Sequence, residues 1–202
     1  MEPFKNHRGI LVTLDRSNVD TDQIIPKQFL KSIQRTGFGK SLFFDWRYLP
    51  DGQPDPAFEL NAPRFKGASI LIARNNFGSG SSREHAVWAI QQCGFKAVIA
   101  PSFADIFRNN SGKNGLLTVE LKEAEVEEIF QMVGRYAGLE ATVDLDEQRV
   151  TLHLPEEISF HFEVDATVKE HLIHGLDGIG LTLKQAEAIS AFESRHDPQL
   201  KR

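Results

Sequence analysis

The sequence predicts a mixed α/β fold, and three observations support this fold class. Two short runs, residues 68–73 and 97–100, are almost entirely apolar, which is typical of strands that helices cover on both faces. A stretch with a helical pattern, residues 84–93, lies between them. Two later segments, 139–145 and 149–154, alternate polar and apolar residues as half-buried antiparallel strands do. We therefore expect a mixed sheet with helices and a strand-rich C-terminal part.

The first third of the chain is expected to hold a strand, a helix and a long loop. Residues 9–14 form an apolar strand, and residues 15–22 form a polar turn. Pro26 suits the first position of a helix that continues through Ile33, because its missing N–H has no partner there in any case. From residue 34 to residue 66 the periodicity is lost, but the many aromatic residues argue against disorder.

The remaining elements follow from the same patterns. Asp165 is expected to cap a helix that Gly175 ends, and residues 182–185 resemble a capping box that opens a final helix. The other expected elements are a helix at 103–109, a strand at 116–121, an amphipathic helix at 123–133 and an alternating strand at 158–164. The sequence has no repeat or linker, so we expect one domain that spans residues 1–202.

Composition excludes several classes of protein. Charged residues make up 25% and hydrophobic residues 41% of the 202 residues, which is ordinary for a folded domain. The longest apolar runs are too short to span a membrane, and the N-terminus has no apolar signal region. A single cysteine, Cys93, provides neither an internal disulfide nor a set of metal ligands. We expect a cytoplasmic protein that binds no metal of its own.

The charge of the chain is unevenly distributed. The formal net charge of −5 disfavours nucleic-acid binding. Residues 64–113 contain seven basic and two acidic residues, whereas residues 119–170 contain 14 acidic and four basic residues. A basic middle section suits a local site for a small anion, although solvated faces of opposite sign would give the same pattern.

A glycine-rich turn follows the apolar run 68–73 and carries the most informative residues. Gly78 and Gly80 allow the backbone to turn tightly and to approach a ligand. Ser81 and Ser82 follow at the expected entrance of the next helix, where free N–H groups and the helix dipole favour an anion. Arg83 adds a planar pair of donors that matches a carboxylate. The turn therefore predicts a site for a carboxylate or a phosphate.

A simpler interpretation assigns these serines to helix capping. Serine is a favoured N-cap, and Glu84, three residues after Ser81, completes a capping box. The turn is neither a Walker loop, because the lysine after the second glycine is missing, nor a dinucleotide-binding fingerprint.

The octapeptide Gly-Ser-Gly-Ser-Ser-Arg-Glu-His at residues 78–85 resembles the signature of the swivelling domain of the aconitase superfamily. Ser79 stands where many relatives carry cysteine. Five further stretches are similar to one branch, the small-subunit family of 3-isopropylmalate dehydratases: residues 18–26, 35–39, 44–47, 101–107 and 175–182. The resemblance covers essentially the whole chain and implies a swivelling β/β/α fold.

The resemblance also implies a reaction. It implies a hydro-lyase of leucine biosynthesis that interconverts 2-isopropylmalate and 3-isopropylmalate through an alkene. This chain would act on the small dicarboxylate only in a heterodimer with a large subunit. That large subunit, and not this chain, would carry a [4Fe–4S] cluster, whose role is to help hydroxide leave. Neither nucleic acid nor a membrane is implied as a partner.

Roles for particular residues follow from the matched motifs. The resemblance implies that Ser81 is the catalytic base, acting as an alkoxide that the site must stabilise strongly. Ser82 and Arg83 would bind a substrate carboxylate. The long loop at about 34–66 would recognise the substrate through Arg35 and Thr36, although Arg35 could equally be a surface residue. The residues expected to support the site from behind are Asp20, Thr21, Asp22, Gly78 and Gly80.

Two other functions remain open at this point. A sister hydro-lyase acting on a homoaconitate-type or citraconate-type diacid would carry the same motifs. A non-catalytic dicarboxylate-binding module could keep the glycine-rich turn and need no partner subunit.

Overall fold

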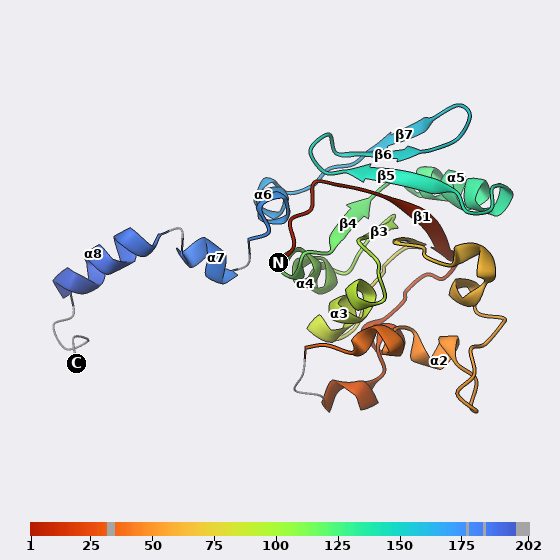
Figure 1. Ribbon diagram of the computed structural model, residues 1–202, viewed down its shortest axis with the longest axis horizontal. Coiled ribbons are helices and arrows are strands. Elements are labelled where there is room, and N and C mark those ends of the chain that lie inside the picture. The colour runs from red at the N-terminus through yellow and green to blue at the C-terminus, as the bar shows by residue number, and fades with distance from the viewer. Residues whose placement is uncertain (32–34, 177, 184, 197–202) are drawn as a thin grey trace.

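The computed structural model describes residues 1–31, 35–176, 178–183 and 185–196. Its described residues contain one mixed sheet with the strand order β4-β3-β2-β1-β5-β6-β7 (Figure 1). The strands are β1 (Asn6–Leu14), β2 (Ile70–Ala73), β3 (Ala97–Ala100), β4 (Leu117–Glu120), β5 (Glu140–Asp144), β6 (Arg149–Leu152) and β7 (Ile158–His161). Each strand expected from the sequence is present, so the predicted mixed α/β class is confirmed.

The sheet has a parallel half and an antiparallel half that meet at β1. Strands β1 to β4 run parallel, with Leu11 opposite Ile70 and Ile70 opposite Ala97. On the other side of β1, strands β5 to β7 form an antiparallel meander. Every residue of β2 and β3 is buried, as the unbroken apolar runs predicted.

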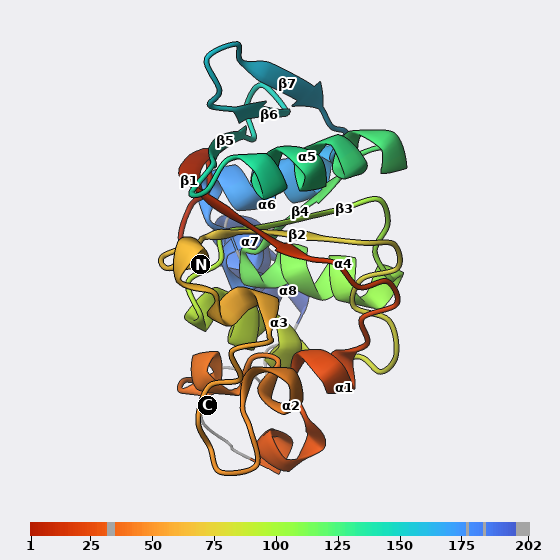
Figure 2. The same cartoon turned by 90° about the vertical axis from the view of Figure 1, so that its right-hand side faces the viewer.

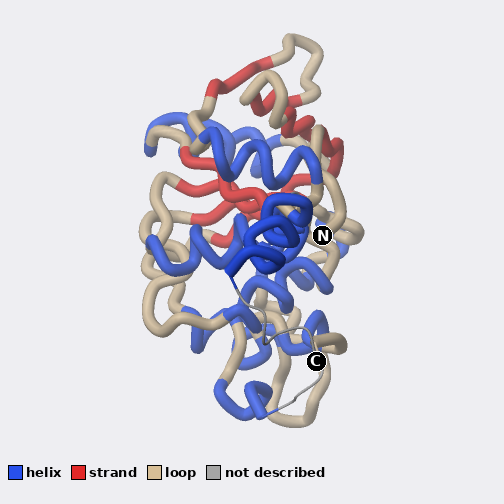
Figure 3. Tube along the Cα trace, turned by 90° about the vertical axis from the view of Figure 1, so that its left-hand side faces the viewer, coloured by secondary structure: helices blue, strands red, loops and turns tan. Residues whose placement is uncertain are grey.

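Helices cover both faces of the parallel half, which explains this burial. Helices α3 (Glu84–Gln92) and α4 (Asp105–Asn114) lie on one face, and α5 (Glu123–Arg135) lies on the other (Figure 2). Figure 3 shows the same layers, with the strands between helices. Helix α3 ends before Gly94, which has φ +110°, as the sequence predicted.

Helix α4 is longer than predicted. The sequence indicated a helix at 103–109, whereas α4 runs from Asp105 to Asn114. Asn, Ser and Gly are poor helix formers, so residues 109–112 concealed the second half of this helix. Tertiary packing overrides that preference, because Ser111 and Gly112 are buried and a side chain at Gly112 would contact Val168 of the following helix α6 (Ala166–His174).

The described part of the segment between β1 and β2 is ordered without being regular. It contains α1 (Thr21–Ile24), α2 (Phe44–Arg47) and four 3-10 turns: η1 (Lys27–Lys31), η2 (Phe38–Ser41), η3 (Glu59–Asn61) and η4 (Pro63–Phe65). Its aromatic residues explain the order, because Phe38, Phe43 and Phe58 are buried. The α-helix predicted from Pro26 is wrong over Lys27–Lys31, which forms a 3-10 turn; Ser32, Ile33 and Gln34 lie outside the described residues.

The C-terminal helices follow the prediction in part. Asp165 caps α6 and Gly175 ends it with φ +63°, as expected. Helices α7 (Gly178–Leu183) and α8 (Ala186–His196) extend away from the sheet (Figure 1). The predicted capping box at 182–185 is wrong, because Thr182 lies within α7 and is not the residue that caps the final helix, α8. Lys184 of that box lies outside the described residues.

Candidate functional site

The candidate site forms where the carboxyl ends of β1 and β2 meet, an edge at which open α/β sheets commonly bind ligands. The turn after β1 and the glycine-rich turn after β2 run side by side. Gly78 N donates to Val19 O at 2.7 Å, and Thr21 N donates to Ser79 O at 2.8 Å. The polar turn and the glycine-rich turn, which are about 60 residues apart in the chain, are therefore joined through their backbones.

Both glycines of the turn adopt backbone conformations that other residues rarely adopt. Gly78 has φ +78° and Gly80 has φ +91°. Gly78 also lies against Phe107 of α4, and a Cβ atom at Gly78 would be 2.2 Å from the Cγ atom of Phe107. The supporting role expected for these two glycines therefore has a steric basis at Gly78 and a conformational basis at both.

Ser81 is exposed at the end of this turn. Its backbone carbonyl accepts a hydrogen bond of 2.9 Å from the Oγ1 atom of Thr21, a buried residue of α1. The capping interpretation of Ser81 is wrong, because α3 begins at Glu84 and its N-cap is Arg83. The two serines also lie further from the helix than expected, since both precede the N-cap. Ser81 is thus exposed and does not cap the helix.

Arg83 is held by Asp22 of α1. Its side chain is 9% exposed, and its Nη1 atom donates to Asp22 Oδ1 at 2.5 Å. The hydrogen bond from Arg83 lowers the pKa of Asp22, and the nearby charge of Lys27 acts in the same direction. Asp22 therefore carries its negative charge at neutral pH and fixes the position of the guanidinium group. Asp20 is less direct, because its side chain accepts from Gln23 N and caps α1.

Ser82 has a partner that sequence reasoning missed. The Asn110 Nδ2 atom, on α4, donates to Ser82 Oγ at 3.2 Å. Nothing near Asn110 in the sequence indicated a site, because residues 110–112 were expected to lie beyond the end of a short helix at 103–109. The closeness of Gly78 to Phe107 on the same helix shows that α4 forms a wall of this site.

Among the described residues, neither Arg35 nor Thr36 forms a hydrogen bond or an ion pair with Ser81. Both are exposed, and the guanidinium group of Arg35 lies 5.6 Å from the ring centre of Trp88 in α3. The Arg35 carbonyl accepts a hydrogen bond of 2.7 Å from Gln92 Nε2 at the end of that helix. The structure therefore attaches this segment to α3, whose opposite end follows Ser81 to Arg83.

No set of three or more His, Cys, Asp or Glu side chains within the described ranges could hold a metal ion. Cys93 is partly buried, and its Sγ atom accepts from Arg47 Nη1 at 3.3 Å. These residues therefore do not fit a metal cluster. In the part of the chain that the structure describes, no helix is long and apolar enough to cross a bilayer.

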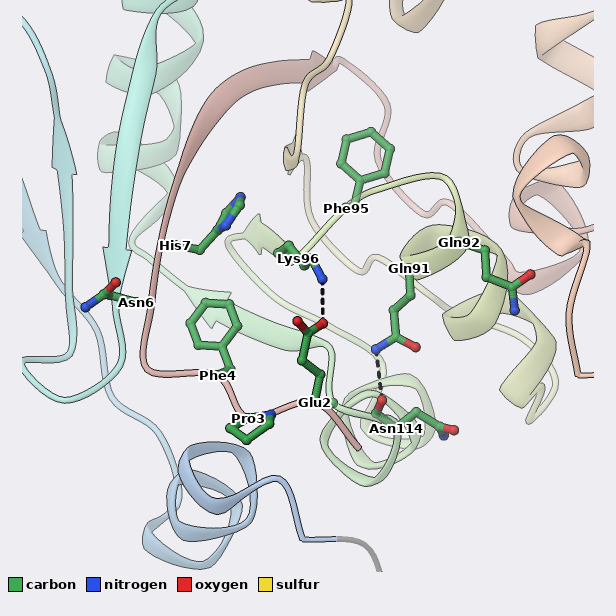
Figure 4. Close-up of a pocket in the computed structure, with 11 residues that line it drawn as sticks. Glu2, Pro3, Phe4, Asn6, His7, Gln91, Gln92, Phe95, Lys96 and Asn114 are labelled. Atoms are coloured by element: carbon green, nitrogen blue, oxygen red, sulfur yellow. Dashed lines mark hydrogen bonds and ion pairs between the residues drawn. The ribbon is translucent and has the colours of Figure 1, made fainter.

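A hollow lies at the other end of α3, away from Ser81, Ser82 and Arg83 (Figure 4). Lys96 and Glu2 form an ion pair of 2.8 Å there, and burial together with the charge of Lys96 lowers the pKa of His7. The His7 Nε2 atom is 2.7 Å from Ser69 Oγ. Because its charged groups already neutralise each other, this hollow offers no free charge to an ionic substrate.

Comparison with known proteins gives a consistent result. The aconitase C-terminal domain family matches residues 1–124, and the family described as the C-terminal domain of the 3-isopropylmalate dehydratase small subunit matches residues 179–199. The chain is 55% identical over 205 aligned residues to a 3-isopropylmalate dehydratase small subunit from Desulforapulum autotrophicum, covering 96% of each chain. A crystal structure of 3-isopropylmalate dehydratase from Methanocaldococcus jannaschii has a TM-score of 0.66 and 25% identity, covering 93% of this chain and 99% of the other.

Proposed function

The chain belongs to the family of 3-isopropylmalate dehydratase small subunits, and we propose that it forms the active hydro-lyase of leucine biosynthesis together with a large subunit. Its substrate pair would be 2-isopropylmalate and 3-isopropylmalate, interconverted by loss and return of water. The whole chain, residues 1–202, would act as one swivelling domain. A single cysteine suits a reducing compartment, which supports a cytoplasmic location.

Ser81 is the proposed base of this reaction. Its alkoxide takes the proton from the carbon next to a substrate carboxylate, the carbon–carbon double bond forms, and hydroxide leaves from the adjacent carbon. Addition of water in the opposite sense returns the proton and gives the isomer. The observation that supports this role is the exposure of Ser81 at the carboxyl edge of the parallel strands, two residues before Arg83.

Arg83 is the proposed carboxylate anchor. Asp22 engages its Nη1 atom, so the guanidinium fork is oriented before the substrate arrives and its other N–H groups can meet a carboxylate. A charge-assisted hydrogen bond of this kind contributes roughly 1.5–3 kcal/mol net. Ser82 would donate to the same carboxylate. Arg35 and Thr36, on the loop at about 34–66, would recognise the substrate's side group from the direction of Trp88.

As the resemblance to the family implies, the [4Fe–4S] cluster would belong to the large subunit, where it would help hydroxide leave. What this chain contributes is a base, a carboxylate anchor and the loop that reads the substrate.

The experiment that tests the proposal compares Ser81→Ala with Ser17→Ala in the enzyme reconstituted from both subunits. Ser17 is an exposed serine in the neighbouring polar turn. We expect Ser81→Ala to lower kcat by roughly 10²–10⁴-fold, the usual contribution of a positioned base, without loss of subunit association. Ser17→Ala should keep wild-type kinetics. Alkene absorbance reports turnover, and gel filtration reports association. Full activity of Ser81→Ala would remove Ser81 from the role of base.

A further inference from the structure

Asn110 reaches the candidate site from a different element than the other site residues. It belongs to α4, and its Nδ2 atom lies 3.2 Å from Ser82 Oγ. Its backbone carbonyl accepts a hydrogen bond of 2.9 Å from the side chain of Asn114, one turn further along α4. Asn114 in turn accepts from the Trp88 indole of α3 at 2.8 Å. The position of Asn110 is therefore set by contacts that join the two helices.

The direction of the Asn110 hydrogen bond determines what Ser82 can do. A serine hydroxyl has one proton to donate and lone pairs that accept, whereas an amide N–H can only donate. Because Asn110 donates to Ser82 Oγ, it uses a lone pair of that oxygen and leaves the hydroxyl proton for another acceptor. Ser82 is exposed, so this acceptor can be a ligand. The contact thus makes Ser82 a hydrogen-bond donor toward an incoming anion.

Ser82 and Arg83 are held by two different elements. Asp22 of α1 orients the guanidinium group of Arg83, and Asn110 of α4 orients the hydroxyl of Ser82. Helix α4 cannot shift freely against the turn, because Phe107 lies where a side chain at Gly78 would be. Ser82 and Arg83 are adjacent in the chain, and each is therefore positioned by a different element.

We propose that Asn110 is a positioning residue for the substrate carboxylate, acting through Ser82 by directing the Ser82 hydroxyl proton toward it. The inference rests on the proposed function, since it takes the dicarboxylate substrate as the acceptor. It adds a residue of α4 to a site that the motifs confine to the turns after β1 and β2.

The test reverses the hydrogen bond at Asn110. In Asn110→Asp the carboxylate can only accept, so the Ser82 proton turns away from the substrate, and the added negative charge repels the substrate carboxylate. In Asn110→Ala the hydroxyl is merely released. Asn109→Asp is the matched control, because it adds the same charge at the preceding, exposed position of α4.

The measurement is steady-state kinetics of the reconstituted two-subunit enzyme, with thermal unfolding of each variant as a check on folding. We expect KM for the dicarboxylate to rise at least tenfold in Asn110→Asp, less in Asn110→Ala, and to stay within twofold in Asn109→Asp. In a Ser82→Ala background, Asn110→Asp should raise KM clearly less than it does in the wild-type background, because only the repulsion between the added charge and the substrate carboxylate remains. A purely structural role would leave the loss from Asn110→Asp unchanged in that background.

Three results would overturn the inference while wild-type turnover is intact. They are equal KM values for Asn110→Asp and Asn109→Asp, a smaller effect of Asn110→Asp than of Asn110→Ala, and an undiminished effect in the Ser82→Ala background. The second of these would mean that the amide oxygen, not its nitrogen, faces Ser82. Absence of turnover in the wild-type pair would instead count against the proposed function itself.

Discussion

At Gly78 the turn that carries Ser81 approaches α4 so closely that no side chain fits. The sequence indicated Gly78 because a tight turn needs a residue without a Cβ atom, and the φ of +78° confirms this reason. The second reason, the Phe107 ring 2.2 Å from a hypothetical Cβ, comes from a residue 29 positions later. Local sequence patterns identify such a glycine, but only the structure shows which element packs against it.

Ser111 provides a residue-scale prediction about stability. It is fully buried in α4, and its hydroxyl finds no hydrogen-bond partner among the described residues. A buried hydroxyl without a partner costs about 1–3 kcal/mol. Ser111→Ala removes that cost and leaves only a small void, so we expect the free energy of unfolding to rise by about 1 kcal/mol or more.

Urea unfolding measures this change, and Asn109→Ala is the control. Asn109 is exposed in the same helix, so its replacement reports only the gain in helix propensity, about 0.5 kcal/mol. If Ser111→Ala gains no more than Asn109→Ala, the Ser111 hydroxyl has a partner in solution.

At the scale of elements, α3 connects the two halves of the proposed site. Ser81 to Arg83 precede its first residue, and Gln92 at its last residue holds the segment that carries Arg35. The Gln92 side chain accepts from Phe38 N at 2.8 Å and donates to Arg35 O at 2.7 Å. One amide group therefore bridges both ends of this short segment and sets its distance from the glycine-rich turn.

Replacing Gln92 should loosen that segment without unfolding the protein. Gln92→Leu removes both hydrogen bonds, whereas Gln92→Glu keeps an acceptor for Phe38 N and loses the donor to Arg35. We expect faster amide exchange at Phe38 in Gln92→Leu only, by roughly tenfold if the bond contributes about 1.4 kcal/mol locally. Tryptic cleavage after Arg35 should accelerate in both variants.

The control for this prediction is Gln53→Glu, an exposed glutamine in the same irregular region. It should leave both exchange and cleavage unchanged. Unaltered exchange at Phe38 in Gln92→Leu would show that the packing of Phe38 against Trp88 and His85 is enough to hold the segment.

The elements that sequence reasoning predicted best are those with a strong periodic pattern. Strands β2 and β3 were identified because helices on both faces require apolar residues at every position. The second half of α4 was missed because its residues are poor helix formers that only the packing against neighbouring helices makes helical. Pro26 indicated a helix start in the right region, but Lys27–Lys31 forms a 3-10 turn without a buried residue, and its Phe29 is partly buried against the ring of Phe44.

At the scale of the whole molecule, the site depends on contacts between distant parts of the chain. Motif resemblance identified Ser81, Ser82 and Arg83 because they are adjacent in sequence. The resemblance did not identify the residues that hold them in place, because Asp22 lies 61 residues from Arg83 and Asn110 lies 28 residues from Ser82. Such pairings arise from the order of strands in the sheet, which local sequence does not specify.

The longest of these pairings also links the stability of the fold to pH. Asp22 joins the turn after β1 to the turn after β2 through Arg83, and the hydrogen bond from Arg83 holds the pKa of Asp22 below its usual value of 3.8. A carboxylate whose pKa is lowered by folding stabilises the folded state above its unfolded pKa. That contribution is lost as the pH falls through the folded value. Asp22→Asn should therefore reduce stability at pH 7 by on the order of 1 kcal/mol, a modest value because the carboxylate is partly exposed.

As the pH falls from about 4 through the lower folded pKa of Asp22, the difference between Asp22→Asn and the wild type should shrink, because the wild-type carboxylate becomes protonated as well. Urea unfolding at several pH values between about 2.5 and 7 would measure the difference in the free energy of unfolding between the two proteins. Asp146→Asn, which replaces an exposed aspartate in the turn after β5, is the control and should run parallel to the wild type. If Asp22→Asn also runs parallel at every pH, Asp22 and Arg83 do not hold the two turns together through charge. The preorientation of Arg83 for a substrate carboxylate would then need another cause.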